Sequence, residues 1–113
     1  MTAPFVIIEQ VKTTLPTQAA AEELAAAIVQ NRLAACVQIT GPILSVYRWQ
    51  GGVNKDQEFS LCCKTTTTRR AQLIDYLRAH HPYELPEIVT CVIQSTPEYA
   101  AWLIEQVDWP QDP

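Results

Sequence analysis

The sequence predicts an α+β fold with the element order β-α-β-β-α-β and one more helix at its C-terminal end. Three observations indicate this order. Short runs rich in β-branched residues alternate along the chain with segments of helical periodicity. The pair Gly51-Gly52 separates two long alternating stretches, as the turn of a β-hairpin does. Thr96-Pro97-Glu98 has the residues that open a helix, with a capping hydroxyl, a proline and an early acid.

The bulk composition is that of one ordinary globular domain, which we take as residues 1–113. The chain is 48% hydrophobic and 18% charged, and its formal net charge of -4 gives no basis for binding nucleic acid or an anionic membrane. No apolar run approaches the roughly 20 residues of a membrane helix. We see no signal peptide at the N-terminus. We therefore expect a cytoplasmic protein with no nucleic-acid or membrane partner.

A central strand and a helix are expected first. Residues 5–11 form a nearly continuous apolar, β-branched run, which is typical of a strand covered on both faces, and residues 13–17 are expected to end it. An alanine-rich helix is expected over residues 18–32, with Leu24 and Ile28 four positions apart on one side. Its small side chains allow a close approach to a sheet.

A long hairpin is expected next. Residues 33–39 begin a strand that Gly41-Pro42 interrupts with a bulge or bend, because proline cannot donate to a ladder. The strand continues over residues 43–49 and returns over 53–64. Arms this long on a small sheet leave edges that need a cover, and self-association is the usual one.

A helix, a strand and a last helix are expected in the second half of the chain. A helix is expected over residues 69–80, a strand over 88–95 and a last helix to about residue 107, and we expect the tail 109–113 to be loosely ordered. This order is ferredoxin-like, an antiparallel sheet with two helices on one face. Its open face needs to be covered by a ligand, a nucleic acid or another chain.

The stretch between the second helix and the last strand is the first candidate for a site. Residues 80–87 hold two imidazoles, two carboxylates and a phenol, and two prolines stiffen the loop. Imidazole with carboxylate suits copper(II), zinc or nickel, which makes His80, His81 and Glu84 candidate metal ligands. The alternative is structural: His81 ends the helix, where a cation is favoured, and hydrogen-bonds within the loop.

A small-molecule pocket is the second candidate. Aromatic walls with few charges are the usual composition of such a site. Alternatively, Tyr47 and Trp49 pack into a subunit interface, where large amphipathic rings are favoured. The candidate pocket residues are Tyr47, Trp49, Glu58, Lys64, His81, Tyr83, Glu84 and Trp102.

Two further classes of function are disfavoured, an enzyme and an RNA-binding sheet, and the acidic balance and the lack of an RNP1-like aromatic run count against the second. Glu58, Lys64, His81 and Glu84 include acid–base groups, but no Ser-His-Asp order, P-loop or GxGxxG motif accompanies them. We therefore expect no enzyme and no organic cofactor. The four cysteines form no CxxC motif and lie in apolar, strand-like segments, so we expect small buried hydrophobes kept reduced, with thiol–metal binding as a weak alternative.

Three motifs resemble the CutA divalent-cation tolerance family. They are RLAACV at residues 32–37, SVYRWQG at 45–51 and HPYELPEI at 81–88. The resemblance extends over about residues 5–107. It implies a ferredoxin-like fold in a tight homotrimer similar to the PII signalling proteins, with the hairpin reaching over neighbouring subunits.

The resemblance also implies a function. The family is linked to tolerance of divalent metals, copper above all, so copper(II) or another divalent cation is the implied ligand. No catalytic activity is established for the family. A pocket between subunits suggests, as the alternative, a PII-like small-molecule sensor or signalling protein. Some family members have a cysteine at the end of the first strand as a candidate metal ligand, where this chain has Thr13.

Overall fold

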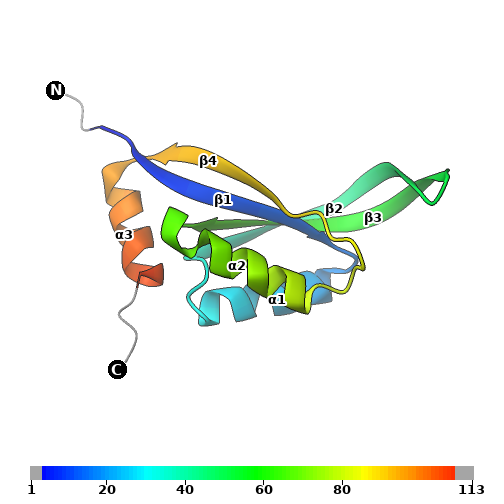
Figure 1. Cartoon of the computed structure of the whole chain (residues 1–113), viewed down its shortest axis with the longest axis horizontal. Coiled ribbons are helices and arrows are strands. Elements are labelled where there is room, and N and C mark those ends of the chain that lie inside the picture. The colour runs from blue at the N-terminus through cyan, green and yellow to red at the C-terminus, as the bar shows by residue number, and fades with distance from the viewer. Residues whose placement is uncertain (1–3, 109–113) are drawn as a thin grey trace.

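The computed structural model describes residues 4–108 and has the predicted element order. The strands form one antiparallel sheet in the order β2-β3-β1-β4 (Figure 1). The predicted α+β fold with an extra C-terminal helix is therefore confirmed. The tail 109–113, which we expected to be loosely ordered, lies outside the described residues. The elements are β1 (Val6–Leu15), α1 (Gln18–Gln30), β2 (Cys36–Trp49), β3 (Gly52–Thr65), α2 (Thr67–His80), β4 (Val89–Ser95) and α3 (Pro97–Val107).

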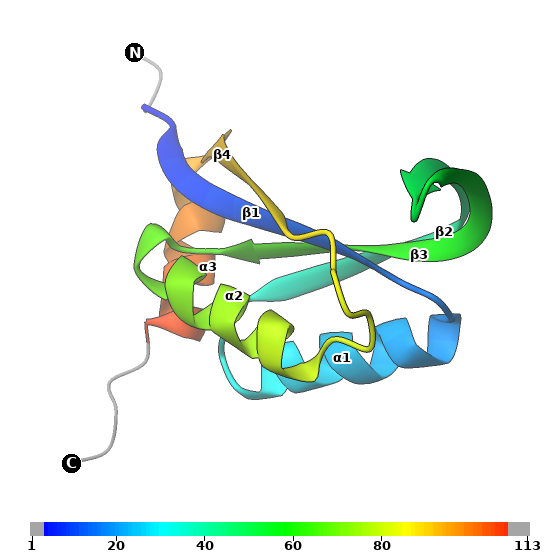
Figure 2. The same ribbon diagram turned by 45° about the vertical axis from the view of Figure 1, so that its right-hand side comes forward.

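The main core lies between the sheet and the two helices α1 and α2, which cover one face (Figures 1 and 2). Alternate residues of the central strands point into it, because successive side chains of a strand face opposite ways. Burial of each large aliphatic side chain contributes about 1.5–3 kcal/mol. The buried strand residues are Val11, Leu15, Phe59, Leu61 and Cys63, and the helices add Leu24, Ile28, Leu73 and Leu77.

Helix α3 covers one end of the opposite face. Ile8 points away from the main core and packs against Ala100, Leu103 and Val107 of α3. Arg69, in α2, donates from Nε to the carbonyl oxygen of Val107 at 2.8 Å, which fixes the end of α3 beside α2. The second sheet face is thus covered at one end by this helix.

Several expected element ends were wrong: strand β2 begins at Cys36 and not at residue 33, and helix α2 begins at Thr67 and not at residue 69. Strand β1 continues to Leu15, because residues 13–15 pair with residues 59–61 of β3 and are buried with them. Helix α1 ends at Gln30, and Arg32 lies beyond it with a φ of 56°. The continuation of β1 comes from its pairing with β3. Helix α1 ends in a local cap, in which Arg32 adopts the left-handed conformation and the N–H of Leu33 donates to the carbonyl oxygen of Ile28 at 3.1 Å.

The cysteines are all free, but only part of the expectation for them is confirmed. Cys63 is buried, and burial raises the pKa of its thiol to about 12. Cys36 and Cys62 are half-buried, and Cys91 is exposed on the edge strand β4, so the expectation that all four are buried was wrong. The opposite orientation of Cys62 and Cys63 follows from strand alternation.

The β2–β3 hairpin extends beyond the helix layer, as Figures 1 and 2 show. The predicted irregularity is present, because the register shifts between Thr40 and Ile43. At this point Gly41 lies against the ring of Phe59: a Cβ on Gly41 would be 2.5 Å from Phe59 Cδ1 and 3.1 Å from the carbonyl oxygen of Glu58. Glycine is therefore required where the hairpin leaves the core.

Replacing Gly41 with alanine should destabilise the fold by about 1–3 kcal/mol, because the added methyl overpacks a buried ring and a backbone carbonyl. Urea unfolding measures the change. Gly52→Ala is the matched control, since nothing lies within 4 Å of a Cβ there. Equal stability of the two variants would contradict the close packing at Gly41.

Candidate functional site

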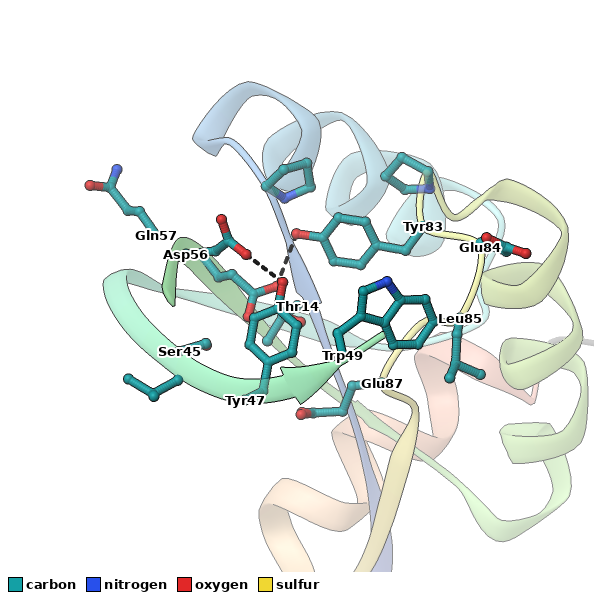
Figure 3. A pocket seen from close by; sticks show the side chains of 14 residues that line it. Thr14, Ser45, Tyr47, Trp49, Asp56, Gln57, Tyr83, Glu84, Leu85 and Glu87 are labelled. Carbon is teal, nitrogen blue, oxygen red and sulfur yellow. Dashed lines mark hydrogen bonds between the residues drawn. The ribbon is translucent and has the colours of Figure 1, made fainter. Parts of the chain in front are cut away.

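The loop between α2 and β4 folds back beside the base of the hairpin, and a cavity of about 890 Å³ lies between them (Figure 3). Segments far apart in the sequence meet here. The residues that line the cavity are Thr14 at the end of β1 and Pro16 just after it, Ser45, Val46, Tyr47 and Trp49 of β2, Asp56, Gln57 and Glu58 of β3, and Pro82, Tyr83, Glu84, Leu85 and Glu87 of the loop.

A hydrogen bond between Tyr83 and Glu58 joins the loop to the hairpin. The phenol of Tyr83 donates to Glu58 Oε2 at 2.9 Å, and Glu58 is only 9% exposed. Burial, and then this hydrogen bond, raise the pKa of Tyr83, so the phenol stays protonated and remains a donor at neutral pH. The bond thus compensates for burying the carboxylate.

Tyr47 makes a similar pair on the hairpin itself. Its hydroxyl donates to Asp56 Oδ2, and this hydrogen bond is the main reason that the pKa of Tyr47 is raised. The rings of Tyr47 and Trp49 are 41% and 39% exposed, so the cavity side of β2 presents aromatic surface to solvent. In Figure 3 these two rings lie beside the ring of Tyr83.

His81 is held inside the chain by both ring nitrogens. Its Nδ1 accepts from the backbone N–H of Tyr83 at 3.1 Å, and its Nε2 lies 2.9 Å from Thr13 Oγ1. With Nδ1 as acceptor, the neutral ring carries its proton on Nε2 and donates it to Thr13. Burial lowers the pKa of His81. The bond to the N–H of Tyr83 agrees with the structural alternative, in which His81 ends α2 and bonds within the loop, but the lowered pKa disagrees with the cation expected there.

His80 lies on a different side. Its ring stacks on Tyr76 at a centroid distance of 4.0 Å, and its Nδ1 is 3.0 Å from the carbonyl oxygen of Tyr76. Glu84 is exposed on the loop. Within residues 4–108, no group of three or more histidine, cysteine, aspartate or glutamate side chains is placed to hold a metal ion. The metal roles of His80, His81 and Glu84 stay predictions.

The other predicted pocket residues divide into two groups. Tyr47, Trp49, Glu58, Tyr83 and Glu84 line the cavity together, and His81 adjoins it through its bond to Tyr83.

Trp102 lies on α3 itself, and Lys64 of β3 lies beside that helix. Lys64 Nζ donates to Gln38 Oε1 at 2.9 Å and is 6.0 Å from the centre of the Tyr99 ring, whose centre is 5.5 Å from that of Trp102. Their place in a ligand pocket stays a prediction.

Asp56 is one of the lining residues that the sequence reasoning missed. The hairpin register supplies the signal that could have found it: the turn pairs Tyr47 with Asn54, so Asp56 lies two residues along the partner strand, diagonal to Tyr47. Thr14 was missed because the first strand was expected to end before it.

Comparisons with known proteins agree on one family. The model of the CutA1 divalent ion tolerance protein family matches residues 10–106. The divalent-cation tolerance protein CutA of Thermus thermophilus is 46% identical over 98 residues, which cover 86% of this chain and 95% of that protein.

Solved structures agree with this match. CutA of Synechococcus elongatus superposes with a TM-score of 0.87 at 37% identity, over 93% of this chain and 96% of that one. The periplasmic divalent cation tolerance protein CutA of Archaeoglobus fulgidus gives 0.84 at 31% identity, over 90% of this chain and 99% of that one. The resemblance stated from the three motifs is confirmed.

The lowered pKa of His81 predicts a loss of stability in acid. Below the ordinary histidine pKa of about 6.5 the unfolded chain binds a proton that the folded chain resists, so stability is present above that pH and falls below it. Urea unfolding at pH 7.5 and 5.5 measures the loss, and a histidine NMR titration should give a pKa below 6.5.

His81→Asn should reduce this loss, whereas the exposed neighbour variant His80→Asn should keep it. An acid loss in His81→Asn as large as in the unmodified protein would contradict the assignment.

Proposed function

The chain belongs to the CutA1 divalent ion tolerance family, and we propose that it acts in tolerance of or response to divalent metal ions, copper(II) above all. In this proposal the protein is a cytoplasmic homotrimer that binds metal ions and catalyses no reaction. The observation that carries it is the family match over residues 10–106. In the part of the chain that the structure describes, no helix is long and apolar enough to cross a membrane.

The donor groups of one chain do not fit a closed copper centre. His81 is already bonded through both nitrogens, and Thr13 offers it a hydroxyl, which is a poorer copper ligand than a thiolate. The proposed metal binding therefore rests on the imidazoles of His80 and His81, each acting as a separate metal ligand. The lowered pKa of His81 keeps its ring neutral at pH 7, so a proton competes little with the metal there.

Calorimetric titration with copper(II) should therefore show saturable binding that weakens at least about tenfold, or 1.4 kcal/mol, when the imidazole that binds is replaced by alanine. Single variants His80→Ala and His81→Ala identify which ring it is. The titrations use a Cys91→Ser background, because this exposed thiol would otherwise bind copper. Binding that survives in the double histidine variant would overturn the proposal of imidazole ligands.

The homotrimer is supported by the uncovered sheet edges. Strands β2 and β4 are the two outer strands of the sheet, and both edges lack a partner within residues 4–108. Unpaired edges with exposed apolar side chains attract another chain. Because the two edges differ, a contact from one edge to the other is head-to-tail, and such contacts give a closed ring when the rotation between subunits closes, as the proposed trimer requires. The exposed apolar residues of these strands and their neighbours are Ile39, Leu44, Val46, Val53, Val89 and Val92.

Multi-angle light scattering should give a mass three times the 12.7 kDa of one chain. Leu44→Asp, which places a charge on a hairpin side chain that is 68% exposed, should lower that mass. Val29→Asp on α1, where the side chain is 42% exposed, is the control and should leave it unchanged. A monomeric mass for the unmodified protein would contradict the trimer.

A small-molecule sensor is the second candidate function, and the cavity at the hairpin base favours it. Its volume of about 890 Å³ lies within the roughly 300–1,000 Å³ of small-molecule sites. Aromatic rings from β2 and from the loop form its walls, and the prolines of the loop keep those walls stiff. This candidate requires that some small molecule, whatever its charge, changes the NMR signals of Trp49 and Tyr83.

A further inference from the structure

We propose that the cavity at the hairpin base binds an organic cation, that is, a small molecule with a protonated or quaternary ammonium group. The inference rests on the second candidate function, because it assigns a ligand class to the same cavity. Three features carry it: the aromatic walls, the charge of the lining and the spacing of the carboxylates.

The aromatic walls are the first feature. The rings of Tyr47 and Trp49 on β2 and of Tyr83 on the loop lie together at the cavity (Figure 3). The face of an aromatic ring attracts a cation within about 6 Å of its centre, and ammonium groups in enclosures of several rings are the best-known case. The half-exposed rings of Tyr47 and Trp49 leave such faces accessible.

The charge of the lining is the second feature. The lining carries four carboxylates, those of Asp56, Glu58, Glu84 and Glu87, and it contains no lysine, arginine or histidine. Glu58 is nine-tenths buried, and the only hydrogen bond of its side chain among residues 4–108 is the one that Oε2 accepts from Tyr83. A largely buried carboxylate favours a positive partner, and an ammonium ligand would supply one where no cationic side chain lines the cavity.

The spacing of the carboxylates is the third feature. No three acidic, cysteine or histidine side chains within residues 4–108 are close enough together to hold one metal ion. The four carboxylates come instead from β3 and from the loop, on two sides of the cavity. A bare metal ion needs converging oxygens at about 2.0–2.6 Å, whereas an ammonium group on a carbon frame interacts with rings and with separated carboxylates at once.

The test compares three probes of one shape and different charge: choline, the neutral 3,3-dimethylbutan-1-ol and the anion 3,3-dimethylbutanoate. Each is titrated into the full-length ¹⁵N-labelled protein while the Trp49 indole and the Tyr47 and Tyr83 amide signals are followed. Choline should shift these signals saturably, the neutral alcohol should bind at least about tenfold more weakly, and the anion should leave the signals unchanged.

Two variants and a matched control locate the binding. Trp49→Ala and Glu58→Gln should each weaken choline binding at least about fivefold. Trp102→Ala removes a tryptophan of similar exposure, 43% against 39% for Trp49, from outside the cavity and should leave the affinity unchanged. Trp49→Phe keeps an aromatic face in the same place and should retain most of the affinity, which separates the loss of the ring from a misfolded hairpin.

The outcomes separate this inference from the function on which it rests. If the neutral or anionic probe shifts the same signals as strongly as choline, the cavity is a ligand site but the organic cation is wrong. If none of the three probes shifts them, the organic cation is overturned, whereas the sensor function fails only if no small molecule of any charge shifts these signals. Equal weakening by Trp102→Ala and Trp49→Ala would also overturn the assignment to this cavity.

Discussion

The hydrogen bond from Tyr83 to Glu58 is the contact on which the geometry of this site depends. It joins a loop that follows α2 to a strand that precedes α2, and it does so at a carboxylate that is nine-tenths buried. A buried carboxylate without its donor costs about 1–3 kcal/mol or more, which is a large share of the stability of a small domain. The loop is therefore fixed against the hairpin, and the cavity exists because both walls are held in place.

The same loop explains why two neighbouring histidines have different surroundings. Helix α2 ends at His80, whose ring stays on the helix surface against Tyr76. The backbone then becomes extended at His81, and its ring turns toward Thr13 of β1 and the N–H of Tyr83. His80 thus lies on the helix surface, whereas His81 lies at a partly buried junction between the loop and β1. A metal would have to compete with two hydrogen bonds at His81 but with one at His80.

Most of the fold could be predicted from the sequence because the signals are local. Alternation around Gly51-Gly52 identified the hairpin, and Thr96-Pro97-Glu98 identified the start of the last helix, which Thr96 caps. The end of β1 could not be predicted in this way. Residues 13–15 include two threonines and precede a proline, which suggested a turn, but pairing with β3 outweighed that local preference.

The features of the candidate site also separate into those set by local sequence and those set by the tertiary structure. The sequence by itself determined the order of the elements, the stiff loop with its phenol and carboxylates, and the aromatic residues of the hairpin, because periodicity, prolines and turn residues act over a few neighbouring positions. Only the tertiary structure decided that Thr13 meets His81, and that Lys64 lies beside Tyr99 of α3. Those pairings depend on strand register and helix docking between segments tens of residues apart, and no local pattern in the chain encodes such distances.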